Sequence, residues 1–138
     1  MDDVSPTTPL ISVVIPLYNE GSHLRELLAD LKTALQETRC RFEVVLVDDG
    51  SSDSTWAAIK DDARMWVDLR AIRLSRNFGK ELALCAGLER ARGNAVIVMD
   101  GDGQHPPSLL PLLIESWRGS GADIVEAVKR SRARIVDE

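Results

Sequence analysis

The chain has 138 residues, of which 44% are hydrophobic and 28% are charged, as is typical of a folded domain and unlike a disordered chain. This length allows one domain with a sizeable core and is too short for two. The net charge of −5, from 22 acidic and 17 basic residues, argues against general attraction to nucleic acid or anionic membranes, so any phosphate must be captured locally.

Targeting and redox signals are sparse. No apolar run approaches the roughly 20 residues of a membrane span, and the acidic start lacks the basic end of a signal peptide. Cys40 and Cys85 are far apart and have no CxxC spacing, which predicts reduced structural thiols and not a disulfide or a zinc site. We therefore expect a cytoplasmic protein.

Apolar stretches alternate with helical patterns after a flexible lead-in over residues 1–9. In chain order the sequence predicts strand 11–17, helix 20–37, strand 42–47, a helix ending near 65, strand 69–74, helix 81–92, strand 94–99, helix 108–118 and strand 123–128. Asn19 is expected to cap the first helix, whose leucines fall on one face. The domain is expected over 10–129, and a charged tail over 130–138.

Four strand–helix units and a last strand indicate an α/β fold, with a mostly parallel sheet and helices on both of its faces. Strand 123–128 is expected to leave its edge unpaired. An unpaired edge beside exposed apolar surface favours association, so this edge is expected to pair with another chain, such as a second copy in a homodimer.

Acidic residues stand directly after two of these strands: Asp48 and Asp49, and then Asp100 and Asp102. The carboxyl ends of parallel strands form the edge at which α/β proteins bind ligands, so these acids should converge there with the basic loop that carries Arg76 and Lys80. Two carboxylates one residue apart suit Mg²⁺ or Mn²⁺, with substrate phosphates completing the shell. An ordinary Asp-Gly turn is the alternative. The cations of the loop would contact a diphosphate or an acceptor phosphate, or else form a solvated loop.

Several other site types have little support. Neither a GxGxxG nor a Walker A sequence follows a strand, which argues against dinucleotide oxidoreductases and P-loop enzymes. No GxSxG elbow occurs, and the two histidines, His23 on an expected exposed helix turn and His105, give weak support for a hydrolase. A metal between acids, with cations nearby, suits a nucleotide diphosphate.

Three segments in this order resemble the successive signatures of family 2 glycosyltransferases: VVIPLYNE at 13–20, VLVDDGSSD at 45–53 and MDGDGQHP at 99–106. The loop LSRNFGKE at 74–81 further resembles the polyprenyl-phosphate branch, the dolichol-phosphate mannose synthase type. The resemblance covers nearly the whole chain and implies the Rossmann-like nucleotide-sugar transferase (GT-A type) fold. It implies the donor-binding part of an inverting, metal-dependent enzyme that moves a sugar from a UDP- or GDP-sugar to a polyprenyl phosphate, at the cytoplasmic face of a membrane.

The resemblance also implies residue roles. The nucleotide pocket would be lined by Pro16, Tyr18 and Glu20, with Asp48 or Asp49 reading the base. The metal and diphosphate site would consist of Asp100 and Asp102, the latter also catalytic, with Gly101 and Gln104 beside them and Lys129 on the last strand.

Three departures from the family pattern stand out. Gly101 and Gly103 replace larger residues of many relatives, which would loosen the loop by adding backbone freedom. Lys129 stands where relatives often place an arginine, whose bidentate fork a point-charge ammonium cannot reproduce. Such enzymes also usually continue into acceptor-binding and membrane helices, so the C-terminal acceptor-binding part is expected to be missing.

Two other functions remain open at this stage. One is a domain that binds nucleotide sugar without turnover. The other is a receiver-like phosphoacceptor domain, which has a similar length and clustered acids. That fold needs acids at the end of the first strand, where Pro16, Leu17 and Tyr18 supply none.

Overall fold

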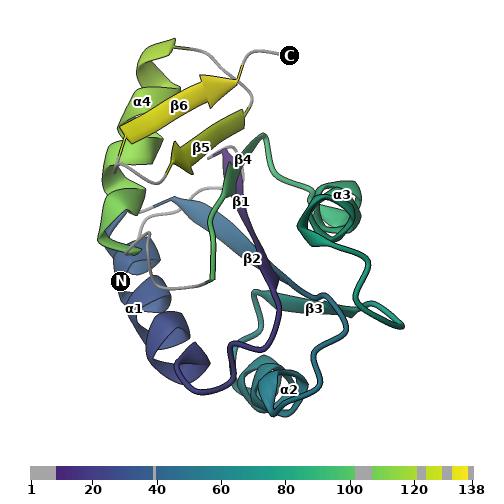
Figure 1. Cartoon of the computed structure of the whole chain (residues 1–138). Coiled ribbons are helices and arrows are strands. Elements are labelled where there is room, and N and C mark those ends of the chain that lie inside the picture. The colour runs from purple at the N-terminus through teal and green to yellow at the C-terminus, as the bar shows by residue number, and fades with distance from the viewer. Residues whose placement is uncertain (1–8, 39, 102–106, 121–123, 129–131, 137–138) are drawn as a thin grey trace.

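A computed structural model of the chain describes residues 9–38, 40–101, 107–120, 124–128 and 132–136. Strands form one sheet in the order β3-β2-β1-β4-β5-β6 (Figure 1). The strands are β1 (Leu10–Leu17), β2 (Arg41–Asp48), β3 (Leu69–Arg73), β4 (Ala95–Val98), β5 (Ile124–Val128) and β6 (Arg132–Val136). The helices are α1 (Leu24–Glu37), α2 (Thr55–Met65), α3 (Lys80–Arg90) and α4 (Leu110–Ser120), the last preceded by the 3-10 turn η1 (Pro107–Leu109).

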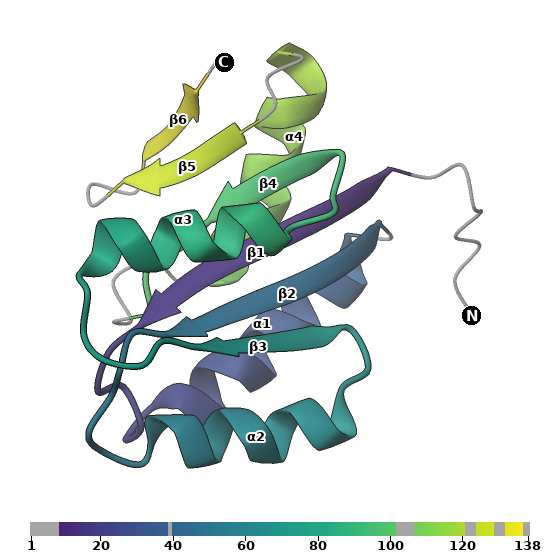
Figure 2. The same cartoon turned by 90° about the vertical axis from the view of Figure 1, so that its right-hand side faces the viewer.

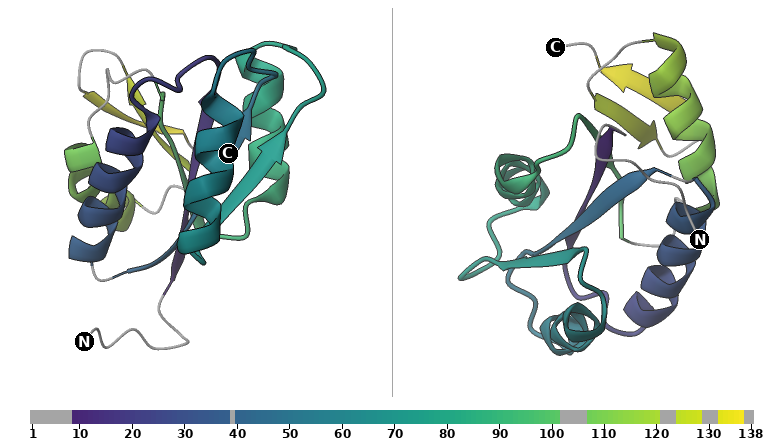
Figure 3. Two further views of the ribbon diagram at one scale, coloured as in Figure 1. Left: turned by 90° about the horizontal axis from the view of Figure 1, so that it is seen from below. Right: turned by 180° about the vertical axis from the view of Figure 1, so that it is seen from behind.

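Helices cover both faces of the sheet, as the sequence predicts. Figure 2 looks onto α3, which lies alone on one face among the described helices, and Figure 3 shows α1 and α4 side by side on the other. The larger core lies under α1, α2 and α4 and includes Val13 and Ile15 of β1, while Val14 faces the smaller core under α3. Because β1 is buried on both faces, its near-continuous apolar sequence is what a central parallel strand requires.

The strand order creates the position of a site. From β1 the sheet continues through β2 and β3 on one side and through β4 and β5 on the other, all parallel. The connections after β1 and β4 therefore leave in opposite directions, and a crevice opens between them at the carboxyl ends of the strands. This switch point is where open α/β sheets bind ligands.

Two details of the elements differ from the prediction. Helix α1 begins at Leu24 and not at residue 20, and His23 occupies its N-cap position. Asn19 is not the cap: it has a φ of 54° and lies in the turn after β1. Its side chain accepts a hydrogen bond from the backbone N–H of Ser52, 2.9 Å away, so it connects two loops.

The expectation of an unpaired edge at strand 123–128 is wrong. β6, which the sequence did not predict, pairs antiparallel with β5 along its whole length, from Ile124 opposite Val136 to Val128 opposite Arg132. A strand of the same chain thus satisfies the backbone groups that were expected to attract a second copy. The argument for a homodimer through this edge is lost.

A buried carboxylate, that of Glu43, forms several hydrogen bonds at the end of the sheet away from the crevice. Glu43 of β2 accepts hydrogen bonds from the Ser12 hydroxyl and the Arg92 backbone N–H, both at 2.6 Å, and from Arg70 at 3.2 Å. Burial raises its pKa, but the bonds from Arg92, Ser12 and Arg70 together outweigh burial and lower the pKa below its usual value. Cys40 nearby is buried and Cys85 is exposed, and both are free thiols, as predicted.

None of the helices in the described ranges combines the length and apolar content that a bilayer crossing requires.

Candidate functional site

A cavity of about 380 Å³ lies at the switch point. It collects the end of β1 and the turn after it, the residue after β2, the loop before α3 with the first residue of that helix, and the residues after β4. Its lining consists of Pro16, Leu17, Tyr18, Glu20, Asp49, Asn77, Gly79, Lys80, Asp100 and Gly101. The structure therefore brings together the predicted residues Pro16, Tyr18, Glu20, Asp49, Lys80, Asp100 and Gly101.

The first and second motifs hold each other in place. The backbone N–H of Asn19 donates to the Ser51 hydroxyl at 2.8 Å, and that of Glu20 donates to the Thr55 hydroxyl at 2.8 Å. Asn19 returns a bond by accepting from Ser52. These bonds fix the backbone at Asn19 and at the N–H of Glu20, so the Glu20 carboxylate reaches the cavity from the turn after β1 and not from the first turn of α1.

Asp53 closes the same junction. It accepts hydrogen bonds from the Thr55 hydroxyl and backbone N–H and, at 3.2 Å, from the Gly21 N–H. The bond from the Thr55 side chain is the main cause of a lowered pKa for this carboxyl, which stays ionised at neutral pH. Asp53 is thus a structural link between the motifs.

Asp49 anchors the loop that forms one wall of the cavity. Its Oδ1 accepts from the Phe78 N–H at 2.8 Å, and its Oδ2 accepts from the Gly79 N–H at 3.1 Å and from Asn77 Nδ2 at 3.2 Å. A carboxylate has about four lone-pair positions, so one position on Oδ1 is left for a ligand in the cavity. Gly50, with φ 71°, allows the loop this close, because a Cβ there would lie 2.2 Å from the carbonyl carbon of Arg76.

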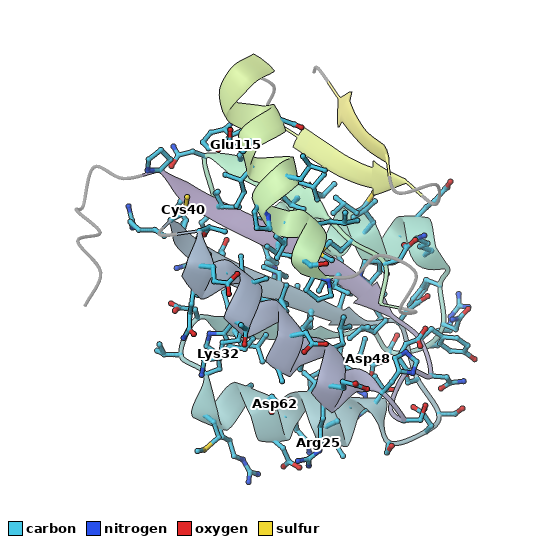
Figure 4. The ribbon with its side chains drawn as sticks, turned by 90° about the vertical axis from the view of Figure 1, so that its left-hand side faces the viewer. Arg25, Lys32, Cys40, Asp48, Asp62 and Glu115 are labelled. Atoms are coloured by element: carbon cyan, nitrogen blue, oxygen red, sulfur yellow. The ribbon has the colours of Figure 1, made fainter. Side chains whose placement is uncertain are left out.

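Asp48 and Arg76 do not line the cavity. Asp48 is fully buried at the carboxyl end of β2, and Figure 4 shows it at the other end of the molecule from Cys40. Its Oδ1 accepts a hydrogen bond from the Ser51 N–H at 3.0 Å, and its Oδ2 lies 3.9 Å from Nε of Arg73. The alternation of β2 explains this placement, since Asp48 shares the face of Val44 and Leu46 that packs under α1 and α2. The Arg76 guanidinium lies 4.2 Å from the centre of the Phe78 ring.

Asp100 lines the cavity directly after β4. Its side chain is 16% exposed, and Oδ1 forms an ion pair with Nζ of Lys80. Among the described residues no group of three or more His, Cys, Asp or Glu side chains is positioned to hold a metal. The donor chemistry of the cavity nevertheless fits a hard divalent cation shared with phosphates, since the carboxylates of Asp100 and Glu20 both line it.

Gly101 is held by close packing and is not a loose point in the loop, contrary to the sequence interpretation. A Cβ at this position would lie 2.1 Å from Cδ2 of Leu17, so the backbone lies flat against that side chain. His23 Nε2 lies 3.2 Å from the Gly101 carbonyl oxygen. No local pattern predicts this contact, because His23 precedes Gly101 by 78 positions and its spacing indicates only an exposed helix turn.

Five residues singled out in the sequence lie outside the described residues: Asp102, Gly103, Gln104, His105 and Lys129. Their predicted roles stay predictions.

The family model described as Glycosyl transferase family 2 matches residues 12–133. The chain belongs to this family. An uncharacterized glycosyltransferase of Synechocystis is 45% identical over 122 residues, which are 88% of this chain and 38% of that protein. An undecaprenyl-phosphate 4-deoxy-4-formamido-L-arabinose transferase of Aeromonas hydrophila is 40% identical over 124 residues, 89% of this chain and 38% of that protein. The chain therefore spans less than two fifths of the length of these relatives.

Solved structures agree with the family and confirm the GT-A type fold. A mannosyltransferase of Pyrobaculum calidifontis in complex with GDP-Man and Mn²⁺ matches with a TM-score of 0.69 at 27% identity, over 88% of this chain and 37% of that one. Residues 1–349 of TarS from S. aureus in complex with UDP-GlcNAc match with a TM-score of 0.63 at 29% identity, over 82% of this chain and 32% of that one.

Proposed function

We propose that the chain is the donor-binding part of an inverting, metal-dependent glycosyltransferase that moves a sugar from a UDP- or GDP-sugar to a polyprenyl phosphate. The observation that carries this proposal is the cavity at the switch point, which gathers the residues of three family motifs on one surface. Its volume of about 380 Å³ is within the usual range for sites that bind small molecules.

The wall formed by the first and second motifs suits the nucleoside. Tyr18 is 46% exposed at the cavity, so its ring can pack against a base without rearranging the core. The remaining lone-pair position of Asp49 can accept one N–H of the base. Uracil and guanine both present such a donor, so this wall can accept either a UDP-sugar or a GDP-sugar.

The side formed by Asp100 and Lys80 suits the diphosphate. Asp100, with Asp102 of the same motif, would hold Mg²⁺ or Mn²⁺. When bound, the metal would neutralise charge on the departing nucleoside diphosphate. Lys80 reaches the same place from the loop before α3, and its ammonium can exchange the Asp100 carboxylate for a phosphate oxygen, which keeps its charge paired.

A polyprenyl phosphate acceptor is supported by the undecaprenyl-phosphate transferase of Aeromonas hydrophila. A phosphate oxygen of the acceptor would attack the anomeric carbon of the donor sugar as the bond to the nucleoside diphosphate breaks, which inverts the configuration at that carbon. A phosphate is anionic at neutral pH and needs less help from a general base than a hydroxyl. Such an acceptor would bring the protein to the cytoplasmic face of a membrane.

Calorimetric titration of the 138-residue chain with UDP and with GDP, each with and without Mn²⁺, tests donor binding. We expect at least one nucleotide to bind more tightly with Mn²⁺, and Asp100→Asn to remove the gain. Asp68→Asn, an exposed acid distant in sequence from the motifs, is the matched control. Equal affinity with and without metal would contradict the metal assignment.

A transfer assay separates the two functions that share this cavity. The chain is incubated with labelled UDP- or GDP-sugar, Mn²⁺ and undecaprenyl phosphate in detergent, and the label in the lipid fraction is counted. Label transfer supports the glycosyltransferase. Because the chain spans less than two fifths of its relatives' length, transfer is expected to be slow. Nucleotide binding with no transfer above the Asp100→Asn background would support the alternative, a nucleotide-sugar-binding domain without turnover.

A further inference from the structure

His23 makes a contact that the family motifs do not account for. It stands at the N-cap of α1, but its side chain makes no capping hydrogen bond. Instead, Nε2 lies 2.8 Å from Oε1 of Glu20 and 3.2 Å from the carbonyl oxygen of Gly101. The imidazole therefore bridges the first motif and the third motif.

The partners define which ring nitrogen carries the hydrogen. A carboxylate and a carbonyl can only accept hydrogen bonds, so Nε2 must be the donor to both. The other nitrogen, Nδ1, lies 3.4 Å from the Ser22 hydroxyl, which can donate to it. A hydrogen on Nε2 fits both acceptors, whereas the Nδ1–H tautomer would place the lone pair of Nε2 against them.

The position of this bridge matters because Glu20 and Gly101 both line the cavity, whereas His23 does not. The Gly101 carbonyl belongs to the peptide bond that leads into Asp102, the second acid of the motif. Glycine restricts its own backbone little, so outside contacts are needed to fix the direction of the Gly101 carbonyl. Leu17 packs against the Cα side of Gly101, and His23 holds its carbonyl.

We propose that His23 is a positioning residue of the donor site. Its Nε2–H holds the Glu20 carboxylate and the Gly101 carbonyl together, so that the carboxylates of Glu20 and Asp100 meet the diphosphate and its metal in a fixed orientation. This role rests on the proposed function. It adds a residue of α1 to a site that the motifs build from the strand ends.

The binding experiment compares His23→Ala, His23→Gln and the control Glu26→Gln, an exposed change in the same first turn of α1. Partners that orient metal ligands typically contribute 10–100-fold to metal affinity, so we expect His23→Ala to lose roughly 10-fold in Mn²⁺-supported affinity for UDP or GDP. Affinity for the nucleoside should fall much less, because Tyr18 and Asp49, which would contact the base, are not partners of His23. Glutamine can donate from a similar position and should restore most of the loss.

A spectroscopic experiment tests the bridge without metal or nucleotide. The chain has two histidines, so long-range proton–nitrogen spectra are assigned by comparison with His23→Ala. We expect the Nε2–H tautomer for neutral His23, with a shift of its Nε2 signal in Glu20→Ala. The Nδ1–H tautomer would overturn the proposal.

The binding outcomes distinguish the positioning role of His23 from the proposed function of the cavity. Unchanged Mn²⁺-supported affinity in His23→Ala, or an equal loss for nucleoside and diphosphate, overturns the positioning role and leaves the proposed function standing. Absence of Mn²⁺-supported binding in the unmodified chain overturns the proposed function itself.

Discussion

Replacing Asp49 with alanine should destabilise the protein and not only weaken nucleotide binding. The carboxylate is 3% exposed and accepts hydrogen bonds from Asn77, Phe78 and Gly79. Alanine would leave all three donors without this partner. The loop carries Gly79 and Lys80 into the cavity wall, so the site should loosen together with the loop.

The size of the effect follows from these contacts. Hydrogen bonds to a charged group contribute about 1.5–3 kcal/mol each. Asn77 and Phe78 are exposed, so donors on this loop can turn towards water, and the low end of that range applies. We expect Asp49→Ala to lose about 4.5 kcal/mol of unfolding free energy, from three bonds at about 1.5 kcal/mol each. Asp49→Asn should lose about two thirds as much, because its carbonyl oxygen can still accept from Phe78 while its amide faces two donors.

Urea unfolding of the unmodified chain, both variants and Asp68→Ala as an exposed control measures this. The midpoint should fall with an unchanged slope, which indicates lost stability and not a change in compactness. A loss of under about 0.5 kcal/mol for Asp49→Ala, the usual range of surface substitutions, would refute the anchoring role. Equal losses for alanine and asparagine would contradict the expected contribution of the bond from the Phe78 N–H, which only asparagine can keep.

Three further predictions concern other parts of the chain. Gly101→Ala should lower the free energy of unfolding by about 1–3 kcal/mol through overpacking against Leu17, and Leu17→Ala should lower it by about 2–5 kcal/mol. In urea unfolding, the double variant should lose less than the sum of the two single losses. The pKa of Glu43 is lowered in the folded protein, so its contribution to stability is present above the usual glutamate pKa of 4.5 and is lost as the pH falls through the folded pKa. In unfolding measured as a function of pH, Glu43→Gln should reduce this loss of stability at acid pH. Lys80→Ala should raise the affinity of the nucleotide-free protein for Mn²⁺, because it removes the ammonium that pairs with Asp100, and it should lower the affinity for the nucleoside diphosphate. Calorimetry that shows both affinities changing in the same direction would contradict this prediction.

The sheet order near the site could be expected from sequence because local and tertiary requirements agree there. Strands such as β1 and β2 are short, apolar runs that end at proline or at paired acids, and they are buried on both faces. Their carboxyl ends must meet at one edge in a parallel sheet, which places Asp49 and Asp100 near each other whatever the details of the loops. The family motifs supplied the rest of the cavity.

What the sequence did not predict depends on contacts between distant residues. β6 lies in a charged stretch, and edge strands commonly carry charges, so its composition resembles a tail. Asp48 and Asp49 are adjacent, chemically identical and both buried, yet backbone alternation turns Asp48 away from the cavity and Asp49 into its lining. The packing of Leu17 on Gly101 and the bridge from His23 join positions far apart in the chain, for which no local pattern exists.

The central claim is that the cavity at the switch point is the donor site, and a crystal structure of the chain with Mn²⁺ and UDP or GDP tests it most directly. The account predicts the base between Tyr18 and Asp49 and the diphosphate beside Asp100 and Lys80. A nucleotide bound elsewhere, such as in the neighbouring hollow lined by Ser51, Arg73 and Ser75, with the cavity left empty, would contradict it.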